Sequence, residues 1–251
     1  MKKHYFGCKR DLFDKRDFKF SMVAPFKELP SSVNLSDTSY IPKVFNQGSL
    51  GSCTANAIGN CYLFVRNKER KISDYIPSRL FIYYNERLTE GTVNEDSGAM
   101  IRTGMKVINK YGACIEKLFP YKVKSFAEKP SEDAYTNGLD FQSIVYSRIN
   151  NTLIETKTCL SSGYPFVLGI SIYENFETEE VAKTGIVSMP EGGCLGGHAV
   201  LAVGYDDSTK RFKIMNSWGD DWGDNGYFYL PYDYLTNNTL TSDLWTIREV
   251  E

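Results

Sequence analysis

The pattern of apolar residues changes at about residue 140, and this change limits the folds that the chain can adopt. From Ser52 onward, apolar side chains recur every three or four residues, until a polar stretch at 67–70 ends the pattern. Residues 78–88 and 98–111 form two more segments of this kind, and a glycine follows the second. We therefore predict that the first half of the chain is mainly helical.

After residue 140 the apolar residues fall into short runs that are rich in β-branched and aromatic side chains and are separated by Gly, Asp and Asn. These runs lie at 142–147, 165–173, 198–205, 211–216 and 226–230. Such strands suit a small barrel or a curled sheet. We predict an α+β fold with a helical lobe at 34–140, a β-barrel-like lobe at 141–251, and the functional site in the cleft between them.

Net charge and hydropathy exclude several classes of partner. The 251 residues carry a net charge of −2, so no basic field is available to recruit nucleic acid or anionic lipid. No apolar run approaches the roughly 20 residues that a membrane span requires. Charged residues interrupt residues 1–20 before an apolar signal core can form. We expect no nucleic-acid partner, no membrane partner, and a cytoplasmic or other reducing compartment.

The residues that usually bind metals are sparse and scattered. Six cysteines occupy positions 8, 53, 61, 114, 159 and 194, and no two have Cys-x-x-Cys spacing. With two histidines, His4 and His198, the chain lacks the clustered ligands of a zinc site. The acidic stretches 177–180 and 220–221 are interpreted as solvated loops. We expect no metal, no organic cofactor, and mostly free thiols.

Residues 1–33 are charged and aromatic without sustained periodicity, and a turn at their end leads into an extended strand. We interpret them as an N-terminal arm or short prosegment that precedes a domain at 34–251. At up to roughly 3.3 Å per residue, the arm is long enough to cross a groove. Two hypotheses are open: the arm occupies the cleft and inhibits the protein, or it packs on the back of a lobe as ordinary structure.

The stretch NQGSLGSCTANA at 46–57 places Cys53 where a turn of small residues becomes a helix. A helix start offers unpaired N–H groups and the positive end of the helix dipole, and both favour a thiolate over a thiol. Cys53 is therefore a candidate nucleophile. The alternative is a small apolar residue at the edge of a core.

A cysteine nucleophile needs a base, and a histidine whose second ring nitrogen is held by an amide suits this role. His198 precedes an apolar strand in GGHAVLAVGY at 196–205. Asn216 ends another in KIMNSWGDDWGDNGYFYL at 213–230, two residues before Trp218. A large ring over an Asn–His hydrogen bond would exclude water and strengthen it.

These three blocks, in this order, resemble the papain-like cysteine peptidases, the group that includes the cathepsins. The resemblance spans about residues 30–251 and implies the two-lobed papain-like fold. It makes Cys53 the nucleophile, His198 its acid/base partner and Asn216 the residue that orients the imidazole. It also implies that Gln47 donates to the oxyanion together with the Cys53 N–H.

The resemblance extends to substrate binding and mechanism. Trp218 would cover the Asn–His hydrogen bond, Gly98 would bind the backbone of an extended substrate, and Ala199 would form a wall of the main specificity pocket. The implied partner is a peptide or protein substrate. The implied reaction passes through a thioester acyl-enzyme, with a thiol pKa lowered by the helix start and the imidazolium.

Two residues depart from the family pattern Cys-Gly-Ser-Cys-Trp around the nucleophile. Leu50 replaces a cysteine that normally forms a disulfide, and Thr54 replaces the tryptophan. The lost bridge agrees with a reducing compartment and resembles microbial or viral members more than lysosomal ones. Thr54 is expected to widen the cleft floor or to alter its polarity.

Other activities are compatible with the same motifs. A papain-like deconjugating enzyme or acyltransferase would use the same acyl-thioester on a different amide. A non-catalytic peptide-binding homologue would keep the groove without the reaction, but the presence of Cys53, His198, Asn216 and Gln47 argues against it.

Overall fold

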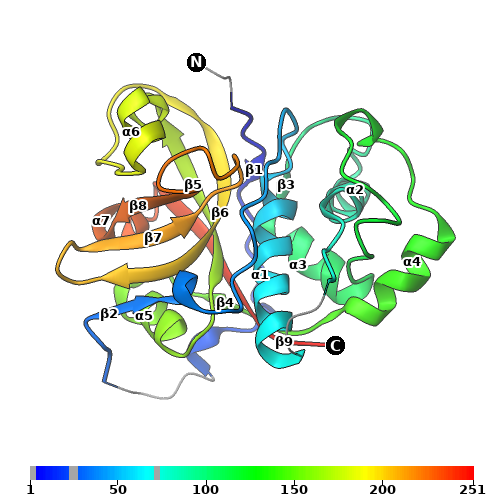
Figure 1. Ribbon diagram of the computed structural model, residues 1–251, viewed down its shortest axis with the longest axis horizontal. Helices are drawn as coiled ribbons and strands as arrows, with labels where there is room; N and C mark the ends of the chain where they lie inside the picture. Colours follow the sequence, from blue (N-terminus) through cyan, green and yellow to red (C-terminus); the bar gives the residue numbers. More distant parts are fainter. Residues whose placement is uncertain (1–3, 23–27, 71–73) are drawn as a thin grey trace.

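The computed structural model describes residues 4–22, 28–70 and 74–251. The helices from the first half of the chain gather on one side of the molecule, and the β-sheet with the later helices lies on the other (Figure 1). Helix α1 (Cys53–Arg70) runs along the boundary between them. The predicted α+β fold, with a helical lobe followed by a β-rich lobe, is confirmed.

The helical lobe is built from segments whose ends carry clear sequence signals. Ser78 caps α2, because its hydroxyl accepts a hydrogen bond from the Phe81 N–H, and Gly91 ends that helix at φ 75°. The helices of this lobe besides α1 are α2 (Arg79–Glu90), α3 (Ile101–Lys110) and α4 (Glu132–Gly138). The helices α5 (Leu153–Ser161), α6 (Glu179–Thr184) and α7 (Tyr232–Thr236) lie on the side of the sheet (Figure 1). Short 3-10 turns are η1 (Phe20–Met22), η2 (Leu35–Asp37), η3 (Val123–Ser125), η4 (Leu139–Phe141) and η5 (Glu174–Glu177).

The second lobe contains one seven-stranded sheet, in the order β4-β9-β5-β6-β7-β8, with β2 paired to β6 outside this path. Its strands are β2 (Ser32–Asn34), β4 (Ser143–Ile149), β5 (Phe166–Tyr173), β6 (Cys194–Asp206), β7 (Arg211–Met215), β8 (Tyr227–Pro231) and β9 (Thr241–Val250). All their pairings are antiparallel. Among the described strands, β4 and β8 stay at opposite ends of this order, so the sheet is curled but not a closed barrel.

The long strand β6 brings the two lobes together. It pairs with β5 and β7 in the sheet, and α1 packs against it from the helical side. The start of α1 and the middle of β6 therefore face each other across the boundary between the lobes. No helix in the described ranges combines the length and apolar character needed to cross a bilayer.

The N-terminal arm lies partly between the lobes and partly against the body of the protein, so each of the two hypotheses describes the position of one part of it. Its strand β1 (Cys8–Lys9) pairs in parallel with β3 (Ala99–Met100), between the lobes (Figure 1). Farther along, the Phe18 carbonyl accepts a hydrogen bond from the Arg148 N–H of β4, and Phe20 is buried in the core. The beginning of the arm thus enters the boundary region, whereas its middle packs on the body of the protein.

Candidate active site

Cys53 is the first residue of α1 and is completely buried. The turn before it is held by Gly51, whose N–H donates to the carboxylate of Asp96 (N···Oδ1 3.0 Å). Backbone N–H groups of Ala199, on β6, and of Gly7, in the arm, approach the sulfur and act to lower the pKa of the thiol. The helix start therefore brings the thiol against the strand that carries the candidate histidine.

His198 lies on β6, and its Nε2 is 2.8 Å from Oδ1 of Asn216. Because that amide oxygen also accepts the Ser217 N–H at 2.9 Å, Nε2 is the donor in the His–Asn pair. The Trp218 ring stacks on the imidazole with centroids 4.9 Å apart. Nδ1 is buried and has no hydrogen-bond partner within the described part of the structure. In the neutral imidazole this nitrogen keeps its lone pair and is able to accept a proton.

Gln47 is fixed between the two lobes by its whole side chain. Its Oε1 accepts a hydrogen bond from the Ser217 hydroxyl at 2.6 Å, and its backbone N–H donates to the Ser217 carbonyl at 2.8 Å. Its Nε2 donates to the carbonyls of Leu50, at 2.8 Å, and Tyr5, at 3.0 Å. The pattern of motifs gave no role to Ser217, yet this residue connects Gln47 to the loop that follows Asn216.

The residues predicted to bind substrate lie beside the arm. The Ala99 N–H donates to the Gly7 carbonyl at 2.7 Å, and a Cβ on Gly98 would be 1.9 Å from the same oxygen. Ala199 is completely buried and pairs with Gly169, where a Cβ would be 3.1 Å from the Cys8 sulfur. Gly98 and Ala199 are therefore brought to one cleft, and the arm fills it.

Arm residues 4–9 follow this cleft from end to end. His4 stacks on Trp218, with ring centroids 3.8 Å apart and an interplanar angle of 3°. The Phe6 ring meets the edge of His198 with centroids 6.0 Å apart. After Gly7 passes Cys53, β1 continues along β3. The arm thus covers the thiol and the imidazole.

Burial beneath the arm keeps both groups neutral. It raises the pKa of Cys53 to about 11, against the smaller effect of hydrogen bonds from Ala199 and Gly7. It lowers the pKa of His198 to about 4, against the hydrogen bond with Asn216. The lowered thiol pKa expected from the helix start is therefore not present in the covered state, because loss of solvent outweighs the N–H groups.

The two departures from the family pattern are both buried. Thr54 donates its hydroxyl to Oε2 of Glu86 at 2.8 Å, and burial raises the pKa of that carboxyl well above its usual range. Thr54 therefore adds a polar contact beneath the cleft, in line with the expectation that it alters the polarity of the cleft floor. Leu50 is an apolar core residue. All six cysteines are free, and Cys194 is exposed.

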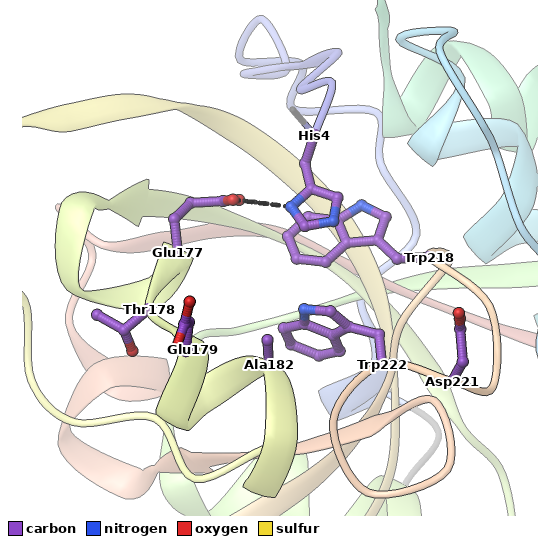
Figure 2. A pocket seen from close by; sticks show the side chains of 8 residues that line it. All are labelled: His4, Glu177, Thr178, Glu179, Ala182, Trp218, Asp221 and Trp222. Carbon is purple, nitrogen blue, oxygen red and sulfur yellow. Dashed lines mark hydrogen bonds and ion pairs between the residues drawn. The ribbon is translucent and has the colours of Figure 1, made fainter. Parts of the chain in front are cut away.

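Sequence reasoning missed one contact at the start of the arm. His4 Nδ1 lies 2.8 Å and 3.0 Å from the two carboxylate oxygens of Glu177, which had been interpreted as part of a solvated loop. Figure 2 shows the imidazole above the Trp218 ring and pointing to this carboxylate. No local pattern could have predicted the pair, because its members are 173 residues apart.

Comparison with known proteins reveals one family throughout. The family model described as papain family cysteine protease matches residues 29–243. The uncharacterized peptidase C1-like protein L477 of Acanthamoeba polyphaga mimivirus is 44% identical over 261 aligned positions, covering 96% of this chain and 84% of the viral protein. Xylellain, a cysteine protease from Xylella fastidiosa, superposes with a TM-score of 0.89 at 39% identity, covering 100% of this chain and 99% of xylellain.

A more distant structure shares the fold. Digestive procathepsin L 3 from the Tenebrio molitor larval midgut superposes with a TM-score of 0.75 at 17% identity, covering 93% of this chain and 75% of the procathepsin. Sequence similarity and structural similarity therefore both support the papain-like fold and the peptidase class.

Proposed function

This chain belongs to the papain family of cysteine proteases and is a peptidase, and we propose that Cys53, His198 and Asn216 carry its reaction. The proposal rests above all on His198: Asn216 holds its Nε2, and its buried Nδ1 is left without a partner on the strand that contacts the thiol. A base oriented in this way is what a cysteine nucleophile requires.

In the uncovered enzyme, the thiolate of Cys53 attacks the carbonyl carbon of an extended peptide. His198 donates a proton to the leaving amine, and a thioester acyl-enzyme results. His198 then takes a proton from water, which attacks the thioester and releases the acyl group as a carboxylic acid. Asn216 keeps the ring orientation through both steps, and Trp218 keeps water from the Asn–His bond.

Gln47 supplies a donor for the oxyanion of this reaction. Its Nε2 already donates to a carbonyl oxygen, that of Tyr5, at 3.0 Å. Removal of one such donor typically costs a factor of about 10² to 10³ in rate. Gly98 and Ala199 form the neighbouring surface, where the Ala99 N–H binds the backbone carbonyl of Gly7.

The proposal is tested by hydrolysis of a mixed peptide library under reducing conditions, with wild-type protein and Cys53→Ala. We expect cleavage by the wild type alone, with an epoxysuccinyl thiol probe bound covalently at Cys53. Labelling without peptide cleavage would favour a deconjugating enzyme or an acyltransferase. Neither labelling nor cleavage, even after the arm has been removed, would favour a peptide-binding homologue.

We also propose that residues 4–9 inhibit the peptidase domain at 34–251. Their backbone accepts a hydrogen bond from Gln47, passes Cys53 and pairs with β3, and the buried thiol and imidazole are held neutral. A protein that lacks residues 1–9 should hydrolyse peptides at a higher initial rate, because its cleft is uncovered. Residues 11–20 keep their contacts with the body of the protein, so the fold should be unchanged. An unchanged rate would contradict inhibition by the arm.

The free thiols and the apolar Leu50 support activity in a reducing compartment. A thiol reductant should be required for full turnover, because an oxidised Cys53 is not a nucleophile. Equal turnover with and without reductant, after exposure to an oxidant, would contradict this.

A further inference from the structure

One pocket beside the catalytic residues has a composition of its own. It lies between α6 and the loop after β7, and its floor contains the rings of Trp218 and Trp222 (Figure 2). Glu177, Glu179 and Asp221 contribute three acidic side chains. Among the described residues that line it, His4 of the arm is the single basic one.

His4 is bound in this pocket in two ways at once. Its ring lies parallel to the Trp218 ring at 3.8 Å between centroids, and its Nδ1 contacts both carboxylate oxygens of Glu177. The side chains of His4 and Glu177 are 19% and 20% exposed, so solvent screens this pair less than it screens a surface pair. The arm therefore shows which group fits the pocket: a planar ring that carries N–H donors at its edge.

The position of the pocket relates it to one side of the substrate. Trp218 stacks on His198, which protonates the leaving amine in the proposed reaction. The opposite direction from Cys53 leads along β3 and Gly98. Residues that follow the cleaved bond therefore extend toward Trp218 and Glu177.

We propose, on the basis of this peptidase function, that Glu177 and Trp218 form a subsite for arginine on the leaving-group side of the cleaved bond. A guanidinium is planar and stacks on an indole, and its two parallel N–H groups match two carboxylate oxygens. When the arm leaves, the pocket loses His4 and keeps its acidic and aromatic groups. The arm and the substrate thus compete for one recognition site.

The test compares two peptides in one reaction mixture. They differ only in arginine or citrulline at one of the first two positions after the cleaved bond, because citrulline has nearly the same shape without the charge. The ratio of their kcat/KM values does not depend on the fraction of enzyme that the arm covers. In the wild type we expect the arginine peptide to be preferred roughly tenfold, about the contribution of one charged hydrogen bond.

The ratio should fall to near one in Glu177→Gln and stay at its wild-type value in Glu180→Gln, which removes an exposed charge from the neighbouring α6. A peptide with a coumarin leaving group, which carries no guanidinium, reports whether Cys53 is active without the charge contact to Glu177. Cleavage of this peptide with no arginine preference, or with a preference that survives Glu177→Gln, overturns the subsite and leaves the peptidase function intact. Cleavage of none of the peptides overturns both.

Discussion

The carbonyl oxygen of Tyr5 lies 3.0 Å from Nε2 of Gln47, the side-chain donor that we assign to the oxyanion. Two residues later, the Gly7 N–H approaches the sulfur of Cys53 and acts to lower the pKa of the thiol. The arm therefore satisfies the polar groups of the site with its own backbone. Desolvation of these groups, which would be costly if they were left unpaired, is offset by contacts that an arriving peptide must replace.

Gly7→Ala should displace the arm and activate the enzyme. A Cβ at this position would be 1.8 Å from the Gly51 carbonyl oxygen, and this oxygen belongs to the backbone, so it cannot turn aside as the end of a flexible side chain could. A substitution that weakens the covered state by about 1.4 kcal/mol raises the uncovered fraction about tenfold while the covered state dominates. We expect the initial rate of peptide hydrolysis to rise by at least this factor.

Gly59→Ala is the matched control for Gly7→Ala. It makes the same chemical change within α1, where the nearest atoms to an added Cβ are 3.6 Å away. Its initial rate should equal that of the wild type. If Gly7→Ala has the wild-type rate as well, and its fold is intact by circular dichroism, the arm does not limit access to Cys53.

Displacement of the arm should also change the protonation of Cys53. Burial raises its pKa to about 11 in the covered state, so the group is a thiol at neutral pH. In Gly7→Ala, solvent returns and the N–H groups of the helix start favour the thiolate. The measurement is the ultraviolet absorbance of thiolate as a function of pH, with the Cys53→Ala form of each protein subtracted. Identical titration curves for Cys53 in the wild type and in Gly7→Ala would contradict the prediction.

The sequence predicted those parts of the structure that depend on local patterns. Helical spacing of apolar residues located α1, and the three motifs selected Cys53, His198 and Asn216, which the structure brings to one cleft. The runs of β-branched and aromatic residues located β4 to β8, and the turn at the end of residues 1–33 located β2. The strand β9 (Thr241–Val250) was missed, although it lies between β4 and β5 in the sheet, because its polar residues break the alternation of apolar ones.

The remaining features depend on contacts between distant segments, which local patterns do not encode. The pKa of Cys53 is raised by burial, and the path of the arm over the thiol is not encoded in the local pattern around Cys53. The pair His4–Glu177 arises in the same way. Whether the second lobe is a closed barrel depends on the order of its strands, which the sequence pattern does not give. In the structure this order leaves the sheet open.

Asp11, which holds the arm against the body of the protein, should make the free energy of unfolding depend on pH. The pKa of Asp11 is raised from 3.8 to about 6, first by burial and then by the nearby carboxylate of Asp243. The N–H groups of Arg102 and Trp245 and the charge of Arg148 act in the opposite direction. Because the folded-state pKa is the higher one, the stability that this group contributes is fully present below pH 3.8. It is lost as pH rises through about 6.

Asp243→Asn tests this dependence, because it removes the neighbouring charge and keeps an amide oxygen that is able to accept from Arg148. We expect the thermal midpoint of this variant, relative to wild type, to increase between about pH 4 and 6, by an amount that corresponds to at most about 3 kcal/mol. Asp140→Asn, at an exposed aspartate, should show no such trend. A flat difference for Asp243→Asn would show that the charge of Asp243 does not raise the pKa of Asp11.

Ser217→Ala should impair catalysis through Gln47. The serine hydroxyl donates to Gln47 Oε1 at 2.6 Å, and its loss frees the side chain to rotate away from the position of the oxyanion. We expect kcat to fall roughly tenfold with little change in KM, since the oxyanion forms only in the transition state. Steady-state kinetics with a peptide that has a small leaving group provides the measurement.

The double variant Ser217→Ala with Gln47→Ala separates positioning from general structural damage. If Ser217 acts by holding the amide of Gln47, the double variant should be no slower than Gln47→Ala alone, because the group that the hydroxyl positions is already absent. A further tenfold loss in the double variant would mean that the hydroxyl has an independent role. The loop that follows Asn216 would then be the place to look for it, since the Ser217 N–H donates to the amide oxygen that binds His198.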